Sequence, residues 1–130
     1  MTTGIAAASA NAILDAYCRS VSYTDPVGFF VKLHLGDPGV AGATSPAAET
    51  LRKAVTFSAA ASGAITNSAA LTWTAVSTTE TFSHVSFWDA VSGGAFLGSD
   101  DLNVARAMTA GDTFEIAIGD LDITLGVLAA

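Results

Sequence analysis

The sequence predicts an all-β fold: an antiparallel β-sandwich, jelly-roll-like or immunoglobulin-like, with one N-terminal α-helix. Large apolar residues recur in short bursts separated by Gly, Ser and Thr, at the spacing of about 8–12 residues that is typical of sandwiches and barrels. No alternation of strand and helix patterns is present, which argues against a doubly wound parallel sheet. The 130 residues are expected to form one sandwich domain, residues 21–130, preceded by a helical arm, residues 1–20.

The N-terminal segment is predicted to be helical over residues 4–18. It is rich in Ala and places its larger apolar residues near one stripe. Thr3 could cap the start of this helix, and Arg19 suits its C-terminal end. Because a short helix is stabilised mostly by docking, its apolar face is expected to lie on the domain or on a neighbouring subunit. The candidate assembly contacts on it are Ile5, Ala8, Ala12, Ile13 and Tyr17.

The clearest strand signal covers residues 28–35, where apolar and other residues alternate. A period of two predicts that alternate side chains point to opposite faces of a sheet. On this pattern Leu33 and Leu35 are expected to fill the core, and His34 is expected to face outward.

A tight turn follows this strand in the sequence Gly36-Asp37-Pro38-Gly39. Pro38 fixes φ at the second turn position, the side chain of Asp37 can bond the backbone ahead, and Gly39 accepts a positive φ. These residue types are explained by backbone geometry, so the turn is assigned a structural role.

The rest of the chain contains further candidate strands, separated by groups of Gly, Ser and Asp that favour turns. These strands are expected over residues 51–57, 64–68, 71–76, 81–88, 95–97, 104–108, 113–118 and 121–127. Residues 98–103 contain two Asp and one Asn and are predicted to form a solvated turn. The same oxygen-rich segment is the best available candidate for calcium, but it lacks the acidic alternation of an EF-hand loop.

The chain is acidic, with 5 Lys and Arg against 12 Asp and Glu. Such a surface repels phosphate, so binding to nucleic acid or to an anionic membrane is not expected. Cys18 is the only cysteine, which rules out an internal disulfide and fits synthesis in a reducing cytoplasm. The N-terminus lacks the positive region of a signal peptide.

No catalytic residue, cofactor or metal site is predicted. His34 and His84 are expected on polar strand faces, without the oriented acid and nucleophile that a catalytic base needs. One Cys and two dispersed His do not supply a zinc site. Asp120 and Asp122 are expected on one strand face, where acids discourage stray strand pairing. A histidine enclosed in a pocket beside a nucleophile would instead favour an enzyme.

Two aromatic residues in the segment 81–88 are further candidates for assembly contacts. Phe82 and Trp88 share parity with His84 and stand opposite Val85 and Phe87. One face of this strand therefore carries more apolar surface than an isolated sandwich leaves in water, and a partner would explain it.

Several segments resemble a family of small virion proteins of tailed bacteriophages, particularly phages of actinobacteria. The similarity is carried by VKLHLGDPG at 31–39, NSAALTW at 67–73, TFSHVSFWD at 81–89, AGDTF at 110–114 and GDLDITL at 119–125. Members are identified as tail-fibre-like or minor tail proteins, or as head decoration proteins.

The resemblance implies a non-enzymatic structural protein of the virion, made in the host cytoplasm. Its expected partners are other virion proteins, either major capsid or tail proteins, and further copies in a homo-oligomer. Two locations stay open, capsid decoration and the tail or its fibres. The alternative function is a carbohydrate-binding or adhesin module that acts on the host surface.

Overall fold

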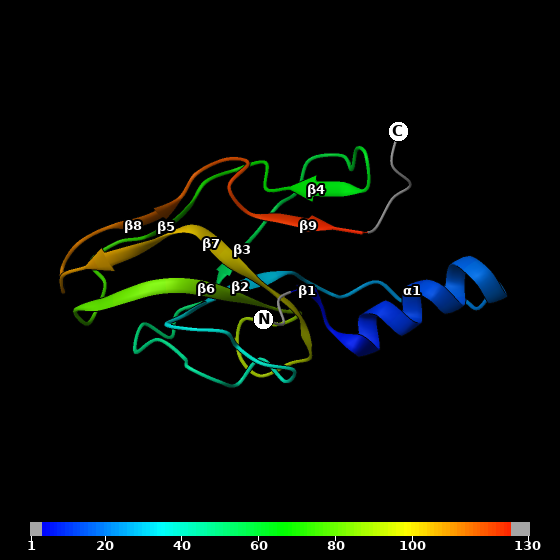
Figure 1. Cartoon of the computed structure of the whole chain (residues 1–130), viewed down its shortest axis with the longest axis horizontal. Coiled ribbons are helices and arrows are strands. Elements are labelled where there is room, and N and C mark those ends of the chain that lie inside the picture. The colour runs from blue at the N-terminus through cyan, green and yellow to red at the C-terminus, as the bar shows by residue number, and fades with distance from the viewer. Residues whose placement is uncertain (1–3, 126–130) are drawn as a thin grey trace.

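The computed structural model of the protein describes residues 4–125 (Figure 1). Five antiparallel strands form the main sheet, in the order β1-β7-β6-β2-β3. Their bounds are Gly4–Ile5 for β1, Phe30–His34 for β2, Lys53–Ala54 for β3, Glu80–Trp88 for β6 and Phe96–Met108 for β7. The main sheet is one layer of the fold.

Two antiparallel strand pairs form the second layer. β4 (Ala64–Thr66) pairs with β9 (Asp122–Thr124), and β5 (Leu71–Trp73) pairs with β8 (Phe114–Ile116). Figure 1 shows both pairs on one side of the main sheet. The predicted all-β sandwich with a single N-terminal helix is confirmed.

The core lies between these layers and is aromatic. The ring centroid of Phe114 in β8 lies 5.1 Å from that of Phe82 in β6 and 5.7 Å from that of Trp73 in β5. All three side chains are buried, and the indole Nε1 of Trp73 donates to the carbonyl of Leu51 at 2.7 Å. A buried indole N–H normally finds such an acceptor, so this contact fixes the ring against the segment before β3.

An irregularity in the pairing of β6 with β7 overturns the parity argument for Phe82. The register shifts between Phe82 and His84, where two steps along β6 lie opposite five steps along β7. Strict alternation of side chains between the two faces does not hold across such an irregularity. Phe82 therefore joins Val85 and Phe87 in the core, fully buried, and the prediction that it lies on an exposed assembly face is wrong.

The outer face of the main sheet is covered by the segment that follows β2. The backbone N–H of Leu35 donates to Ser45 at 2.9 Å, and that of Ala47 donates to Leu33 at 3.2 Å. This return of the chain encloses His34, which is fully buried although it was expected to face outward. Leu35 was expected in the core, but β2 ends at His34 and Leu35 is 42% exposed.

The turn after β2 has the geometry that its residues favour. Oδ1 of Asp37 accepts the N–H of Gly39 at 2.9 Å, and Gly39 has φ of 76°. Pro38 is buried and its carbonyl accepts the N–H of Thr44 at 2.9 Å. Gly36 begins the turn, which starts the return of the chain over the outer face.

The helix α1 spans Ala7–Arg19 and begins later than predicted. The preceding residues Gly4 and Ile5 form β1, which pairs with Ser99 and Gly98 of β7. A Cβ on Gly98 would lie 2.6 Å from the carbonyl oxygen of Gly4, so this glycine permits the close approach of β1. The predicted cap Thr3 lies outside the described residues.

The helix projects from one end of the sandwich (Figure 1) and contains no buried residue. The helix is ended by the residue that follows it, Ser20, whose φ of 57° is left-handed. Among the described residues, no side chain caps its N-terminus at Ala6, and its first turn contains no acidic residue. Within the described residues, no helix has the length and apolarity needed to cross a membrane.

β7 is one continuous strand where a turn was expected. The predicted strands at 95–97 and 104–108 are joined through residues 98–103, of which residues 98–101 pair with β6. The prediction of a solvated turn there is therefore wrong. By contrast, the predicted strand at 51–57 is reduced to the two residues of β3.

Candidate functional site

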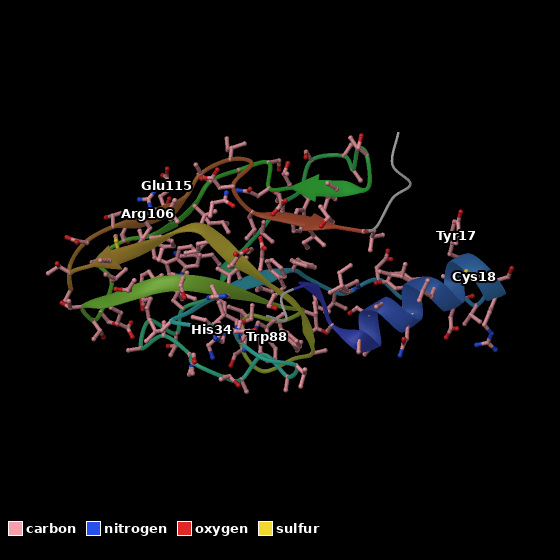
Figure 2. All side chains as sticks on the ribbon, in the orientation of Figure 1. Tyr17, Cys18, His34, Trp88, Arg106 and Glu115 are labelled. Carbon is pink, nitrogen blue, oxygen red and sulfur yellow. The ribbon has the colours of Figure 1, made fainter. Side chains whose placement is uncertain are left out.

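The apolar residues of α1 form the candidate assembly surface. Ile13 and Tyr17 line an apolar groove of about 490 Å³ together with Ala10, Leu14 and Leu125. Leu14 is 58% exposed and Tyr17 is 89% exposed. Figure 2 places Tyr17 near the end of the helix that is remote from the sandwich. This surface is therefore open to a partner.

A second cavity lies at the base of the helix. It has a volume of about 100 Å³ and includes Ile5 and Ile13, with Tyr23, Phe29 and Leu97 among its other lining residues. Phe29 and Leu97 pack against the core. Ile5 and Ile13 thus lie where the helix meets the sandwich, and only part of their surface faces outward.

Ala8 and Ala12 lie on a different face of α1. At about 100° per residue, Ala12 is on the opposite side of the helix from Leu14. Both alanines are exposed. The structure therefore separates the predicted helix contacts into an apolar groove and an alanine face.

Trp88 lies in a cluster on the outer face of the main sheet. Its ring stacks against Phe96 at 5.5 Å, and the guanidinium of Arg52 lies 4.5 Å from its centroid. Nη1 of Arg52 also donates to the carbonyls of Ala90 and Gly93, at 2.8 and 2.7 Å. Cation–π contact and these hydrogen bonds hold the segment after β6 against Trp88. The ring is thus partly occupied by contacts within the chain.

His34 lies beside a serine, in the arrangement that would favour an enzyme. Its Nε2 is 2.8 Å from Oγ of Ser86, and its Nδ1 is 2.8 Å from the carbonyl of Thr44. Because a carbonyl only accepts, Nδ1 carries the proton and Nε2 accepts from Ser86. Burial lowers the pKa of His34, which favours this neutral form.

The pair nevertheless lacks what a nucleophile requires. His34 and Ser86 are both fully buried, so a substrate has no path to Oγ. The Nε1–H of Trp88 donates to the same oxygen at 2.7 Å. Figure 2 shows His34 and Trp88 on the same side of the main sheet. The arrangement satisfies the buried polar groups of these side chains. It also links β2, β6 and the segment that contains Thr44.

The acidic residues considered for sugar cleavage lie in separate places. Asp122 lines a cavity of about 100 Å³ with Asp100, whereas Asp120 lines another of about 90 Å³ with Arg106 and Glu115. A glycosidase needs both carboxyls on one scissile bond. Asp120 and Asp122 therefore do not form such a pair. Among residues 4–125, no group of three or more His, Cys, Asp or Glu is placed to hold a metal ion.

Comparison with known proteins identifies the relationship. A family model described as "Podophage GP4 fiber I protein gp80" matches residues 4–124. The chain belongs to this family. The match includes α1 and every strand of both layers. A comparison with curated proteins found no match.

Membership in a fibre protein family makes the chain a structural component of a bacteriophage virion. The predicted relationship to phage virion proteins is thereby confirmed. The family match also agrees with the absence of an accessible nucleophile at His34, because fibre proteins are generally structural rather than enzymatic.

Leu14 is an exposed apolar residue of α1 that the sequence prediction missed. A signal for it exists: Ala7, Ala10, Leu14 and Tyr17 follow one another at spacings of three and four residues. This is the spacing of the contact positions in a coiled coil. A stripe drawn through Ile5, Ala8 and Ala12 instead follows a neighbouring row of the helix.

Proposed function

We propose that the protein is a non-enzymatic part of a phage tail fibre that assembles through α1 with further copies of itself. The sandwich acts as a compact body, and α1 supplies the contact between copies. The observation that carries this proposal is a 13-residue helix without a buried residue in a chain that belongs to a fibre family. Helices of this length are marginal in water unless they pack against something.

The residue spacing on α1 favours copies of the same helix as the partner. Residues at alternating spacings of three and four form a seam in which side chains of one helix fit between those of another. Leu14 and Tyr17 are exposed along this seam. Parallel helices would therefore bury the apolar groove of each copy.

Charge favours the same contact. The chain has a net charge of −7, so the bodies of two copies repel each other. On α1, Asp15 and Arg19 form an ion pair at 3.0 Å, which leaves this helix neutral. Like-charge repulsion is therefore weakest where the apolar groove lies.

The assembly surface can be tested by comparing two faces of one helix. We expect Leu14→Glu combined with Tyr17→Glu to convert the oligomer to a monomer in analytical ultracentrifugation, with an unchanged circular dichroism spectrum of the β body. The matched control is Ala8→Glu combined with Ala12→Glu, which adds the same two charges to the alanine face. Dissociation by this control, but not by the Leu14 and Tyr17 double variant, would assign the contact to the alanine face instead.

Location on the particle has a separate test. Quantitative mass spectrometry of purified virions counts copies of this chain relative to the capsid protein. A fibre component is present in few copies, whereas a capsid decoration protein is present in hundreds. A capsid-like copy number would contradict a fibre role, and glycan binding by the isolated body would favour the adhesin alternative.

A further inference from the structure

A carboxyl group faces the interior of the sandwich at the boundary between its two layers. Asp100 in β7 pairs with Val85 in β6, and Gly98 pairs with Phe87. Paired residues in an antiparallel sheet point to the same face, and both Val85 and Phe87 are buried in the core. Asp100 therefore points toward the second layer, within a strand where a solvent-facing turn was expected.

The contacts of this carboxyl lead across the boundary. One oxygen, Oδ1, accepts the N–H of Asp101 at 3.0 Å, and the carboxyl also accepts the backbone N–H of Asp122 in β9. The other oxygen, Oδ2, is buried and has no hydrogen-bond partner among the described residues. A buried polar atom without a hydrogen-bond partner destabilises the folded state, and the penalty is larger when its group is charged.

A second acidic residue lines the same small space as Asp100. Asp100 and Asp122 line a cavity of about 100 Å³, with Gly4, Ser99, Ile123 and Thr124 as the other lining residues. β9 belongs to the second layer and β7 to the main sheet. The two acids therefore meet where the β4–β9 pair lies against the main sheet.

We infer that Asp100 forms a pH-sensitive contact between β7 and β9, which is closed when its side chain is protonated and weakened when it is ionised. In the protonated form the side chain of Asp100 is neutral and gains a hydrogen-bond donor. In the ionised form the buried atom Oδ2 carries charge without a hydrogen-bond partner among the described residues, and the charge of Asp122 acts on the same carboxylate.

The surroundings of Asp100 agree with this inference. Burial, followed by the charge of Asp122, raises the pKa of Asp100 to about 7, and Asp101 adds a smaller effect in the same direction. No other charge faces the carboxyl from the described parts of the neighbouring strands: β1 presents Gly4 and Ile5, and β6 presents Val85. His84 pairs with Asp101, on the other face of the sheet.

The contact also lies at the base of the helix. β1 pairs with Ser99, the neighbour of Asp100, and leads through Ala6 into α1. Gly4 lines the same cavity as Asp100 and Asp122. A weaker contact between β7 and β9 at alkaline pH is therefore expected to destabilise β1, the strand that leads into α1. This consequence does not depend on the proposed assembly of α1.

Hydrogen exchange of the β9 amides tests the inference on the full chain. A carboxyl with a pKa near 7 when the contact is closed, and an ordinary value when it is open, makes opening about tenfold more favourable at pH 8 than at pH 6. We expect this rise at residues 122–124 after correction for intrinsic exchange, and we expect it to be absent in Asp100→Asn. The control Asp101→Asn should keep most of it. An equal rise in Asp100→Asn would overturn the inference.

A second measurement needs no variant that alters the core face. Carbon-13 NMR of the unmodified protein reports the ionisation of the Asp100 carboxyl directly. The expected midpoint lies near pH 7, and Asp122→Asn should lower it because one negative charge is removed. A midpoint near pH 4 in the unmodified protein would contradict the inference, whatever the exchange data show.

Discussion

The Nε2 atom of His34 and the Oγ atom of Ser86 lie 2.8 Å apart in a region of the fold that solvent does not reach. In an exposed cleft this distance would suggest a base and a nucleophile. Here the histidine is held on its other side by the carbonyl of Thr44, in the segment that returns over β2. The contact therefore joins that segment to the main sheet. Its structural role can be tested by measuring the free energy of unfolding.

His34 makes the protein sensitive to acid. Its pKa is lowered by burial, so the folded state keeps it neutral while the unfolded state binds a proton below about pH 6.5. More protons are then bound in the unfolded state, and the free energy of unfolding decreases as the pH falls below about 6.5. Urea unfolding at pH 7.5 and 5.0 should show a smaller decrease in His34→Gln than in the unmodified protein.

Asp100 acts in the opposite direction over part of this range, since its raised pKa makes the folded state more stable at lower pH. The comparison must therefore be made between the two proteins at each pH, and not from one curve alone. An identical acid response in His34→Gln would show that another group causes it.

The serine of this pair holds two aromatic side chains. Ser86→Ala removes the partner of Nε2 of His34 and of Nε1 of Trp88. Leaving a buried donor or acceptor without a partner costs about 1–3 kcal/mol, and we expect a loss of this size in the free energy of unfolding at pH 7.5. Ser83→Ala is the control, because Ser83 is only partly buried and its hydroxyl bonds the ring of its neighbour His84 at 2.8 Å. Equal losses would contradict the assigned role.

Much of this fold follows from the alternation of side chains along the sequence. The pattern around Leu33 and around Trp73 predicts the strands that contain them, because one face of each strand is buried. What the alternation does not contain is a bulge. The register shift between β6 and β7 lies between Phe82 and His84, and nothing in the local residue types of β6 distinguishes this place from an ordinary strand.

Contacts between a strand and a segment that later folds over it limit prediction in the same way. His34 was assigned to solvent by its position in β2, but the segment that encloses it is rich in Gly and Ala and carries no periodic signal. Asp100 was assigned to a turn because two acids and an asparagine usually mark one. Both errors arise because contacts with distant parts of the chain outweigh local preference.

Asn67 joins the two strand pairs of the second layer. Its Oδ1 accepts the N–H groups of Gly119 and Leu121, and its Nδ2 donates to the carbonyls of Ala69 and Ala117, all at 3.0 Å. The side chain is 1% exposed, so all four of its hydrogen-bonding positions are used without water.

Replacement of this side chain should therefore be among the most damaging single changes. Asn67→Leu keeps a similar volume but leaves four backbone groups without their partner. We expect a loss of about 3 kcal/mol or more in the free energy of unfolding, measured by urea denaturation. Asn103→Leu is the control, because Asn103 is exposed on β7. A loss below 1 kcal/mol for Asn67→Leu would mean that water replaces these bonds.

The close contact between Gly42 and Phe96 can be separated from backbone strain by comparing two glycines. Both Gly42, with φ of 69°, and Gly111, with φ of 95°, have backbone conformations that disfavour a side chain. A Cβ on Gly42 would lie 2.4 Å from the Phe96 ring, whereas a Cβ on Gly111 meets nothing within 4 Å. Gly111→Ala should therefore cost only the backbone term, about 1–2 kcal/mol.

Gly42→Ala should cost more, because the ring of Phe96 would also have to move away from Trp88, against which it stacks. Overpacking of this kind adds about 1–3 kcal/mol. The indole of Trp88 would lose its contact with Phe96, so its fluorescence in the folded state should change. The difference between the two variants in urea unfolding measures the packing contribution alone. Equal destabilisation, with unchanged Trp fluorescence, would show that the loop carrying Gly42 shifts freely and that it does not hold Phe96 in place.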